Sequence, residues 1–178
     1  MIKTGIFGGS FNPIHNGHIS LARQLKESAG LDEVWLMVSP QNPLKQNMEL
    51  LDDEARFEMA KAALKGEEGI IASDYEMHLP KPSYTWNTLE ALKQEFPDRE
   101  FVLMIGGDNW EHFDRWYRAE DIKKAYKIVV YTRTPGDPGF IDISSTEIRQ
   151  RIREGKSIRR LVPRVVAELI RKNGYYSV

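Results

Sequence analysis

The chain contains no cysteine, which excludes disulfide bonds, thiolate zinc sites, iron–sulfur clusters and cysteine nucleophiles. It also lacks a long apolar run. The longest runs, Val34–Val38 and Phe101–Ile105, have five residues each, whereas a membrane-spanning helix needs ~20. The N-terminus carries one lysine and then turns glycine-rich, without the apolar core of a signal peptide. We therefore expect a soluble, cytoplasmic protein with no membrane contact.

Charge is distributed unevenly along the chain. The 178 residues include 25 Lys and Arg against 26 Asp and Glu, a formal net charge of −1. From Glu147 to the C-terminus, nine basic residues stand against three acidic ones, so this segment carries +6 and the rest of the chain −7. Such a basic end is either a solvated helix face or a contact surface for an anionic partner, such as nucleic acid or a phosphate-rich small molecule.

Short β-rich runs alternate with segments of helical period. Strands are predicted at Thr4–Phe7, Val34–Val38, Ile70–Ser73, Phe101–Ile105 and Ile128–Thr132. Helices are predicted at about Gly17–Ala29, Asp53–Leu64, Thr85–Phe96, Ala119–Lys124, Ser145–Glu154 and Pro163–Lys172. Most of the strands are unbroken apolar runs, which is typical of strands covered on both faces. The alternation predicts an α/β fold with a doubly wound parallel sheet, whose ligands bind beyond the carboxyl ends of the strands.

The segment that leaves the first predicted strand and enters the first helix reads Gly8-Gly9-Ser10-Phe11-Asn12-Pro13-Ile14-His15-Asn16-Gly17-His18. Adjacent glycines allow the backbone to approach a ligand closely, and a helix N-terminus favours anions. The segment does not match the GxGxxG dinucleotide fingerprint. The one Gly-Lys-Ser sequence, Gly155–Ser157, is no P-loop, because it follows a helix and has Gln150 where the first glycine belongs.

His15 and His18 are three positions apart, so they share one face of the first helical turn. Two imidazoles at this place can donate hydrogen bonds to phosphate oxygens and stabilise charge that grows on a phosphorane. The alternatives are histidines that cap or pack the helix, or half of a metal site. A metal site is disfavoured because the other two histidines, His78 and His112, bring no metal-binding motif such as HExxH.

A second anion-binding segment is predicted where the run Ile143-Ser144-Ser145-Thr146-Glu147-Ile148-Arg149 begins a helix. Ser144 or Ser145 is expected to cap this helix. Exposed hydroxyls, free backbone N–H groups and Arg149 one turn further on would form a cradle for anions. Two such cradles on one sheet suit a triphosphate that is held at both ends.

Gly8–His18 resembles the GGSFxPxHxGH signature of the nucleotidyltransferase superfamily, and Ile143–Arg149 resembles its ISSTxIR signature. Between them, Ser83-Tyr84-Thr85, Gly106-Gly107-Asp108 and Trp116 resemble the nicotinate mononucleotide adenylyltransferase family. The match extends in order over nearly the whole chain. It implies one Rossmann-like nucleotidyltransferase domain over residues 1–178, with a small helical C-terminal part at about residues 144–178.

In the family that the chain resembles, the phosphate of nicotinate mononucleotide attacks the α-phosphorus of ATP, which gives deamido-NAD and pyrophosphate. The resemblance implies that His15 and His18 are catalytic, that Mg²⁺ enters with ATP on phosphate and water ligands, and that the protein has no metal site of its own. The implied ATP-binding residues are Gly8, Gly9, Ser10, Phe11, Gly106, Asp108, Arg133, Ser145, Thr146 and Arg149. The implied mononucleotide-binding residues are Lys45, Tyr84, Thr85 and Trp116.

The chain departs from the family pattern at two places. Asn12 stands where many members carry Asp, and Ser39–Lys45 replaces a common Pro-His-Lys pattern, which leaves the role of Lys45 open.

A nicotinamide mononucleotide or pantetheine phosphate adenylyltransferase would share both cradles and differ in the acceptor pocket. A non-catalytic nucleotide-binding regulator is disfavoured by the two intact histidines. A nucleic-acid binder is disfavoured because the basic C-terminal residues lack interleaved aromatics. Homo-oligomer formation stays open.

Overall fold

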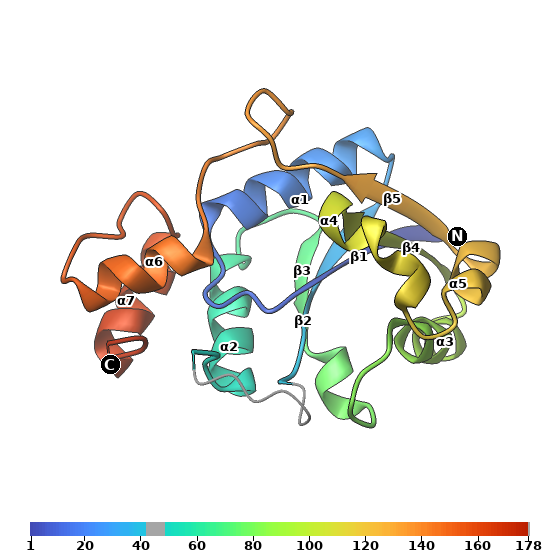
Figure 1. The fold of residues 1–178 in the computed structure, drawn as a ribbon, viewed down its shortest axis with the longest axis horizontal. Coiled ribbons are helices and arrows are strands. Elements are labelled where there is room, and N and C mark those ends of the chain that lie inside the picture. The colour runs from blue at the N-terminus through green and yellow to red at the C-terminus, as the bar shows by residue number, and fades with distance from the viewer. Residues whose placement is uncertain (42–48, 178) are drawn as a thin grey trace.

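A parallel five-stranded sheet lies at the centre of the computed structural model, which describes residues 1–41 and 49–177. The strand order is β3-β2-β1-β4-β5, and every neighbouring pair is parallel (Figure 1). The strands are β1 (Ile2–Gly9), β2 (Glu33–Val38), β3 (Ile70–Ser73), β4 (Arg99–Gly106) and β5 (Lys127–Tyr131). The predicted fold class is confirmed, and the strand order reverses between β1 and β4. A ligand of such a sheet binds beyond the carboxyl ends of these two strands.

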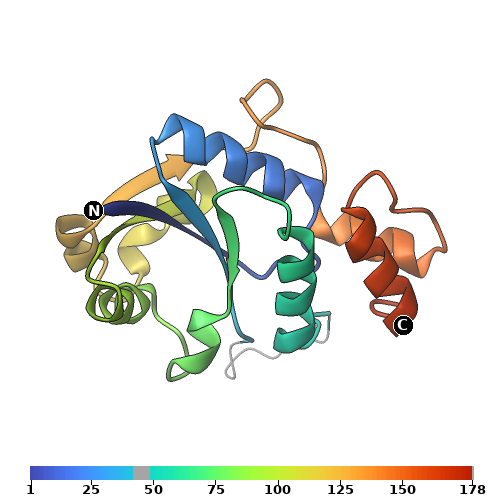
Figure 2. The same ribbon diagram turned by 180° about the vertical axis from the view of Figure 1, so that it is seen from behind.

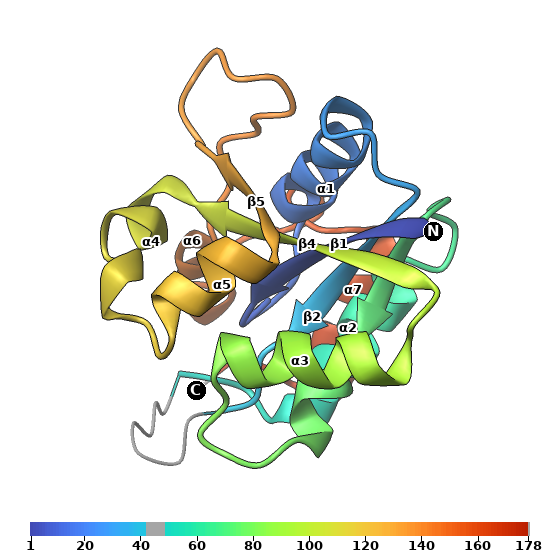
Figure 3. The ribbon, with the colours of Figure 1, turned by 90° about the vertical axis from the view of Figure 1, so that its right-hand side faces the viewer.

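Helices cover both faces of the sheet. The helices are α1 (Asn16–Ser28), α2 (Asp53–Ala63), α3 (Thr85–Glu95), α4 (Gly107–Glu111), α5 (Ala119–Ala125), α6 (Ser145–Arg153) and α7 (Arg164–Asn173), with 3₁₀ turns η1 (Tyr75–His78) and η2 (Phe113–Arg115). Successive side chains of a strand point to opposite faces. In β4, Val102 and Met104 therefore join the core under α1 and α2, while Leu103 and Ile105 join the core under α3 and α5. Figure 3 looks onto the α3 and α5 face.

The six predicted helices are present within one or two residues of their expected bounds. Pro163, predicted to open the last helix, stands one position before it as the N-cap of α7, and Gly174 ends α7 with φ +66°. The sequence analysis missed α4, η1 and η2, which have three to five residues each. A single short turn has no room for a hydrophobic period, so the periodicity that predicts longer helices could not find them.

The two C-terminal helices pack on the α1 and α2 side of the sheet. α7 lies beside α2 (Figure 2), and Ile148, Val166 and Ile170 belong to the same buried core as the residues below α1 and α2. The backbone N–H of Asn16 at the start of α1 donates to the carbonyl of Leu161 at 2.9 Å. None of the helices in the described part of the chain combines the length and apolar character that crossing a membrane requires.

Candidate active site

His15 and His18 cap the first helix reciprocally. His15 is the N-cap residue of α1, and its Nδ1 accepts the backbone N–H of His18 at 3.3 Å. In return, Nδ1 of His18 accepts the backbone N–H of His15 at 3.1 Å. The two rings are stacked, with centroids 3.6 Å apart and planes 20° from parallel. The histidines therefore cap the helix, which was one of the alternatives considered from the sequence. The same bonds fix both rings at the helix N-terminus.

The capping bonds determine which nitrogen carries the proton. A neutral imidazole has one N–H donor and one acceptor nitrogen. Because both Nδ1 atoms accept, the hydrogen of each neutral ring is on Nε2. Burial lowers the pKa of His15 to about 3, and the positive charge of Arg133 adds to this effect. Burial, then His15 and then Arg133 lower the pKa of His18 well below its usual value. Both rings are therefore neutral donors at neutral pH.

Gly17 allows the rings to lie this close to the helix. A Cβ at this position would stand 2.8 Å from Cε1 and 2.9 Å from Nδ1 of His15, and 3.3 Å from Nη2 of Arg133. The same Arg133 nitrogen donates to the carbonyl of Ile143 at 3.0 Å. Phe11 places its ring edge-on to His18, with centroids 4.8 Å apart. A glycine between the two histidines is therefore needed for the imidazoles and the guanidinium to share one space.

The serine-rich segment lies directly against the histidine-bearing loop. Ser144 caps α6 by accepting the backbone N–H of Glu147 at 3.1 Å. Ser145 Oγ donates to the carbonyl of Pro13 at 2.9 Å. Arg149 Nη1 donates to the carbonyl of Asn12 at 2.8 Å. The two motifs are thus in contact, although 132 residues separate Ser145 from Pro13.

Arg149 is mostly buried, with 12% of its side chain exposed. Its Nη2 lies 3.4 Å from Thr146 Oγ1 and 3.7 Å from a carboxylate oxygen of Glu49. Its Nε is buried and has no hydrogen-bond partner among the described residues. A buried donor without a partner is costly, which makes this guanidinium ready to accept an anion.

A cleft of about 230 Å³ opens at the carboxyl ends of the strands. Five of the predicted site residues line it: Gly8, Gly9, Thr85, Gly106 and Trp116. The sequence analysis did not single out other polar residues that also line it, namely Ser39, Glu76, Thr88, Asn109 and Tyr131. Trp116 packs on Phe113 with ring centroids 4.9 Å apart, so it is both a wall of the cleft and part of the core below α5.

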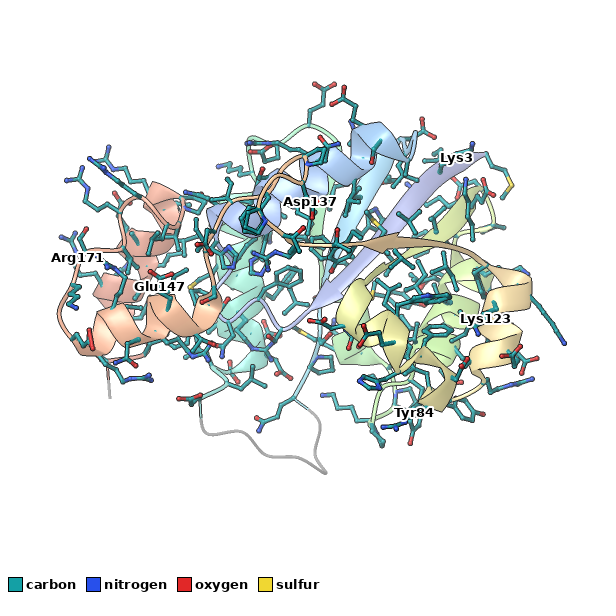
Figure 4. All side chains as sticks on the ribbon, turned by 45° about the horizontal axis from the view of Figure 1, so that its top comes forward. Lys3, Tyr84, Lys123, Asp137, Glu147 and Arg171 are labelled. Atoms are coloured by element: carbon teal, nitrogen blue, oxygen red, sulfur yellow. The ribbon has the colours of Figure 1, made fainter. Side chains whose placement is uncertain are left out.

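The described residues that line the cleft include neither the histidine pair nor Phe11, Arg133 and the predicted residues of α6. Ser10, Tyr84 and Asp108 are exposed and are not among the described residues that line the cleft. Tyr84 is the N-cap residue of α3, and its ring lies against Tyr117 with centroids 5.0 Å apart. Figure 4 labels Tyr84 and, on the opposite side of the view, Glu147 of α6. Lys45 lies outside the described residues.

The sequence analysis also missed a buried arginine beneath the site. Arg56 in α2 has no exposed surface, and its Nη1 donates to the carbonyls of Ser10 and Ser39, each at 2.8 Å. It also pairs with Asp53. Arg56 thereby ties the segment after β1 to the segment after β2. The available signal was its helical spacing from Met59 and Ala60, both buried.

The described residues contain no cluster of three or more His, Cys, Asp or Glu side chains that could hold a metal ion. The charged group beside the histidine pair is the Arg133 guanidinium, and Arg149 bonds to the loop that precedes His15. An arrangement of neutral N–H donors, hydroxyls and guanidinium groups can bind and stabilise a polyphosphate.

Comparison with known proteins identifies the family of the chain. Residues 6–151 match the family model described as cytidylyltransferase-like, so the fold and the site define a nucleotidyltransferase of this class. A Bacteroides fragilis protein named "Probable nicotinate-nucleotide adenylyltransferase" is 50% identical, over 88% of this chain and 85% of its own. A Cytophaga hutchinsonii protein of the same name is 43% identical, over 99% of each chain. The chain belongs to the cytidylyltransferase-like family and, within it, to the nicotinate-nucleotide adenylyltransferases.

Solved structures share the fold over the whole chain. A Vibrio parahaemolyticus protein, provisionally named a nicotinate-nucleotide adenylyltransferase, has a TM-score of 0.79 at 28% identity and covers 99% of this chain and 96% of its own. The Plasmodium falciparum nicotinic acid mononucleotide adenylyltransferase, complexed with NaAD, has a TM-score of 0.77 at 20% identity and covers 99% and 98%. At that identity, the second comparison supports the fold alone.

Proposed function

We propose that this chain transfers the adenylyl group of Mg-ATP to nicotinate mononucleotide, which forms deamido-NAD and pyrophosphate in NAD biosynthesis. The observation that carries the proposal is the contact between the two anion-binding segments, in which Ser145 and Arg149 bond to the loop that leads into His15. One polyphosphate can reach donors from both segments. The names of the relatives at 43% and 50% identity support the same reaction.

The chemistry requires no side-chain nucleophile, because the phosphate of the mononucleotide is already ionised. One of its oxygens forms a bond to the α-phosphorus of ATP, the bond from that phosphorus to the oxygen bridging to the β-phosphate breaks, and pyrophosphate leaves. Catalysis is then positioning together with stabilisation of the negative charge on the reacting phosphates. The Nε2–H groups of His15 and His18 are suited to donate hydrogen bonds to those oxygens.

The leaving pyrophosphate would be held at the start of α6. Thr146 is exposed there, Ser145 is partly exposed, and Arg149 has a buried Nε without a partner in the described part of the chain. The N-terminus of a helix favours anions. Mg²⁺ would arrive with ATP and keep phosphate and water ligands, in agreement with its reluctance to lose its hydration shell.

The acceptor mononucleotide would lie in the cleft beside Trp116. The indole ring offers a flat apolar surface for the pyridine ring, and Thr85, the first residue of α3, also lines the cleft. Tyr84, the N-cap residue of α3, makes no side-chain hydrogen bond to the first turn. Backbone N–H groups of that turn are therefore open to a carboxylate, which favours nicotinate over nicotinamide mononucleotide.

The test is a turnover assay of the purified chain with Mg-ATP and, side by side, nicotinate mononucleotide, nicotinamide mononucleotide and phosphopantetheine. We expect pyrophosphate release to be fastest with nicotinate mononucleotide. His18→Ala should lower kcat by about a hundredfold with little change in the KM for ATP, because the ring acts on charge that develops in the transition state. Release with none of the acceptors would overturn the proposal, and a preference for another acceptor would replace nicotinate in it.

A further inference from the structure

One acidic side chain lines the cleft at the carboxyl ends of the strands. Glu76 on η1 forms part of its wall together with Thr85, Thr88 and Trp116. Among the described residues that line the cleft, the other titratable group is the phenol of Tyr131. Glu76 therefore borders the space that the proposed function assigns to the pyridine ring and its substituent.

Thr88 can bond to Glu76 in either protonation state. Its Oγ1 lies 3.2 Å from Oε2 of Glu76 and 3.3 Å from the carbonyl oxygen of Tyr84. A hydroxyl has one hydrogen to donate and lone pairs that accept. Beside an ionised Glu76, the hydroxyl donates to the carboxylate. Beside a Glu76 that is protonated on Oε1, the hydroxyl still donates to Oε2 or to the Tyr84 carbonyl, and the single carboxyl hydrogen on Oε1 stays available to a ligand. Thr88, only 2% exposed, keeps a partner in both cases.

Among the described residues, the charged groups on the elements around Glu76 are paired with one another or lie at the other end of the sheet. Burial raises the pKa of its carboxyl, and the hydrogen bond from Thr88 opposes part of that rise. η1 packs against β2, and Thr88 comes from α3. Lys93 of α3 lies at the amino ends of the strands, beside Arg99. The other titratable groups on these elements have partners of their own: Asp74 with His78, Glu33 with Arg99, Glu90 with Tyr126 and Glu95 with Tyr75.

We propose that the proton on the Glu76 carboxyl decides between the acid and the amide form of the pyridine mononucleotide. This inference rests on the proposed function. A protonated Glu76 can donate to the carboxylate of nicotinate, whereas an ionised Glu76 repels that carboxylate and accepts a hydrogen bond from the NH₂ group of nicotinamide. Glu76 is then the specificity-determining residue of the acceptor pocket, and Thr88 is its positioning residue.

The experiment measures the ratio of kcat/KM for nicotinate mononucleotide to kcat/KM for nicotinamide mononucleotide at several pH values. The ratio cancels the titration of the phosphate that both acceptors share, of ATP and of the histidine pair. In the wild-type enzyme, the ratio should fall as the pH rises, by up to about tenfold per pH unit once Glu76 ionises, the limit for one proton. In Glu76→Gln, whose amide does not titrate, the ratio should stay constant.

Two further variants sharpen the test. Thr88→Val removes the hydrogen bond that lowers the pKa of Glu76, so the fall should move to higher pH. Glu95→Gln removes an exposed carboxylate of α3 outside the cleft, and its kcat/KM ratio should fall with pH as in the wild type. A constant ratio in the wild type, a wild-type slope in Glu76→Gln, or an unshifted fall in Thr88→Val would overturn the inference while the proposed function stood. Turnover with neither acceptor would overturn both.

Discussion

Arg149 of α6 donates a hydrogen bond of 2.8 Å to the backbone oxygen of Asn12, 137 residues earlier in the chain. This bond fixes the relative position of the two segments that together would hold ATP. The guanidinium has two functions, because one of its nitrogens holds the loop before His15 while the buried Nε has no partner in the described residues. A planar group with several donors can serve a carbonyl and a phosphate at the same time.

Arg149→Lys should therefore weaken ATP binding more than a change of charge would explain. A lysine ammonium is a point charge and cannot bond to the Asn12 carbonyl and a phosphate in the same fixed geometry. We expect the KM for ATP to rise by about tenfold to a hundredfold, the value of one charge-assisted hydrogen bond. Arg171→Lys on the exposed surface of α7 is the matched control. Equal KM values for the two variants would contradict this role of Arg149.

The buried histidine pair predicts how stability depends on pH. In the folded protein the pKa of His15 is about 3, whereas an unfolded histidine titrates near 6.5. Below about pH 6.5, the unfolded chain binds a proton that the folded chain does not. The free energy of unfolding therefore falls by about 1.4 kcal/mol for each such ring with every unit by which the pH decreases. His15→Asn keeps an N-cap acceptor but does not titrate. Urea unfolding between about pH 7 and 5 should show a shallower loss for this variant.

Gly17→Ala should damage activity although alanine favours helices. In an ordinary helix this change is stabilising by about 1 kcal/mol. Here the new Cβ would stand 2.8 Å from the His15 ring, so the ring must move and the stack with His18 must open. We expect kcat to fall by at least about tenfold, because donors displaced by about 1 Å no longer match the transition state.

Gly66→Ala is the matched control, since no atom lies within 4 Å of the Cβ that it adds. This variant should keep the wild-type kcat. If Gly17→Ala also kept the wild-type kcat, the close approach of the His15 ring to the helix would have no part in catalysis.

Trp110 and Trp116 form a matched pair for the acceptor cleft. Both pack on Phe113, with ring centroids 5.1 Å and 4.9 Å apart, but of the two only Trp116 lines the cleft. Trp116→Ala should raise the KM for the mononucleotide by about tenfold, from the loss of a stacking surface, and leave the KM for ATP unchanged. Trp110→Ala should change neither KM. Steady-state kinetics with each substrate varied in turn will decide, and equal effects of the two substitutions would assign Trp116 to the core.

The sequence predicted the features that depend on local pattern. Short β-rich runs, most of them unbroken and apolar, located the five strands, and the motifs around His15 and Ser145 located both halves of the candidate site. The roles of Glu76 and Arg56 could not be predicted in this way. Each of them depends on which distant backbone or cleft the side chain meets after folding, and a lone Glu or Arg on a helix is usually solvated. The missed residues are therefore those whose partners come from other elements.

Asn12 is the clearest example, because the sequence assigned it no role. The structure shows a residue that is 4% exposed and joins three segments. Its Nδ2 donates to the carbonyl of Glu49 at 2.9 Å, and its Oδ1 accepts from Leu51 N–H at 3.1 Å and from the hydroxyl of Tyr176 at 2.7 Å. An aspartate, which many family members carry here, could accept the bonds from Leu51 and Tyr176 but could not donate a bond to the carbonyl of Glu49.

Asn12→Asp should therefore destabilise this chain. The substitution replaces a buried donor with an oxygen that faces the carbonyl of Glu49, and we expect the free energy of unfolding to fall by about 1–3 kcal/mol. Tyr176→Phe, which removes one donor to Oδ1, should cost about 1 kcal/mol in the wild type. It should cost more in the Asn12→Asp background, because a hydrogen bond to a charged acceptor is stronger. Additive losses in this double-mutant cycle would mean that the side chains at positions 12 and 176 are not coupled.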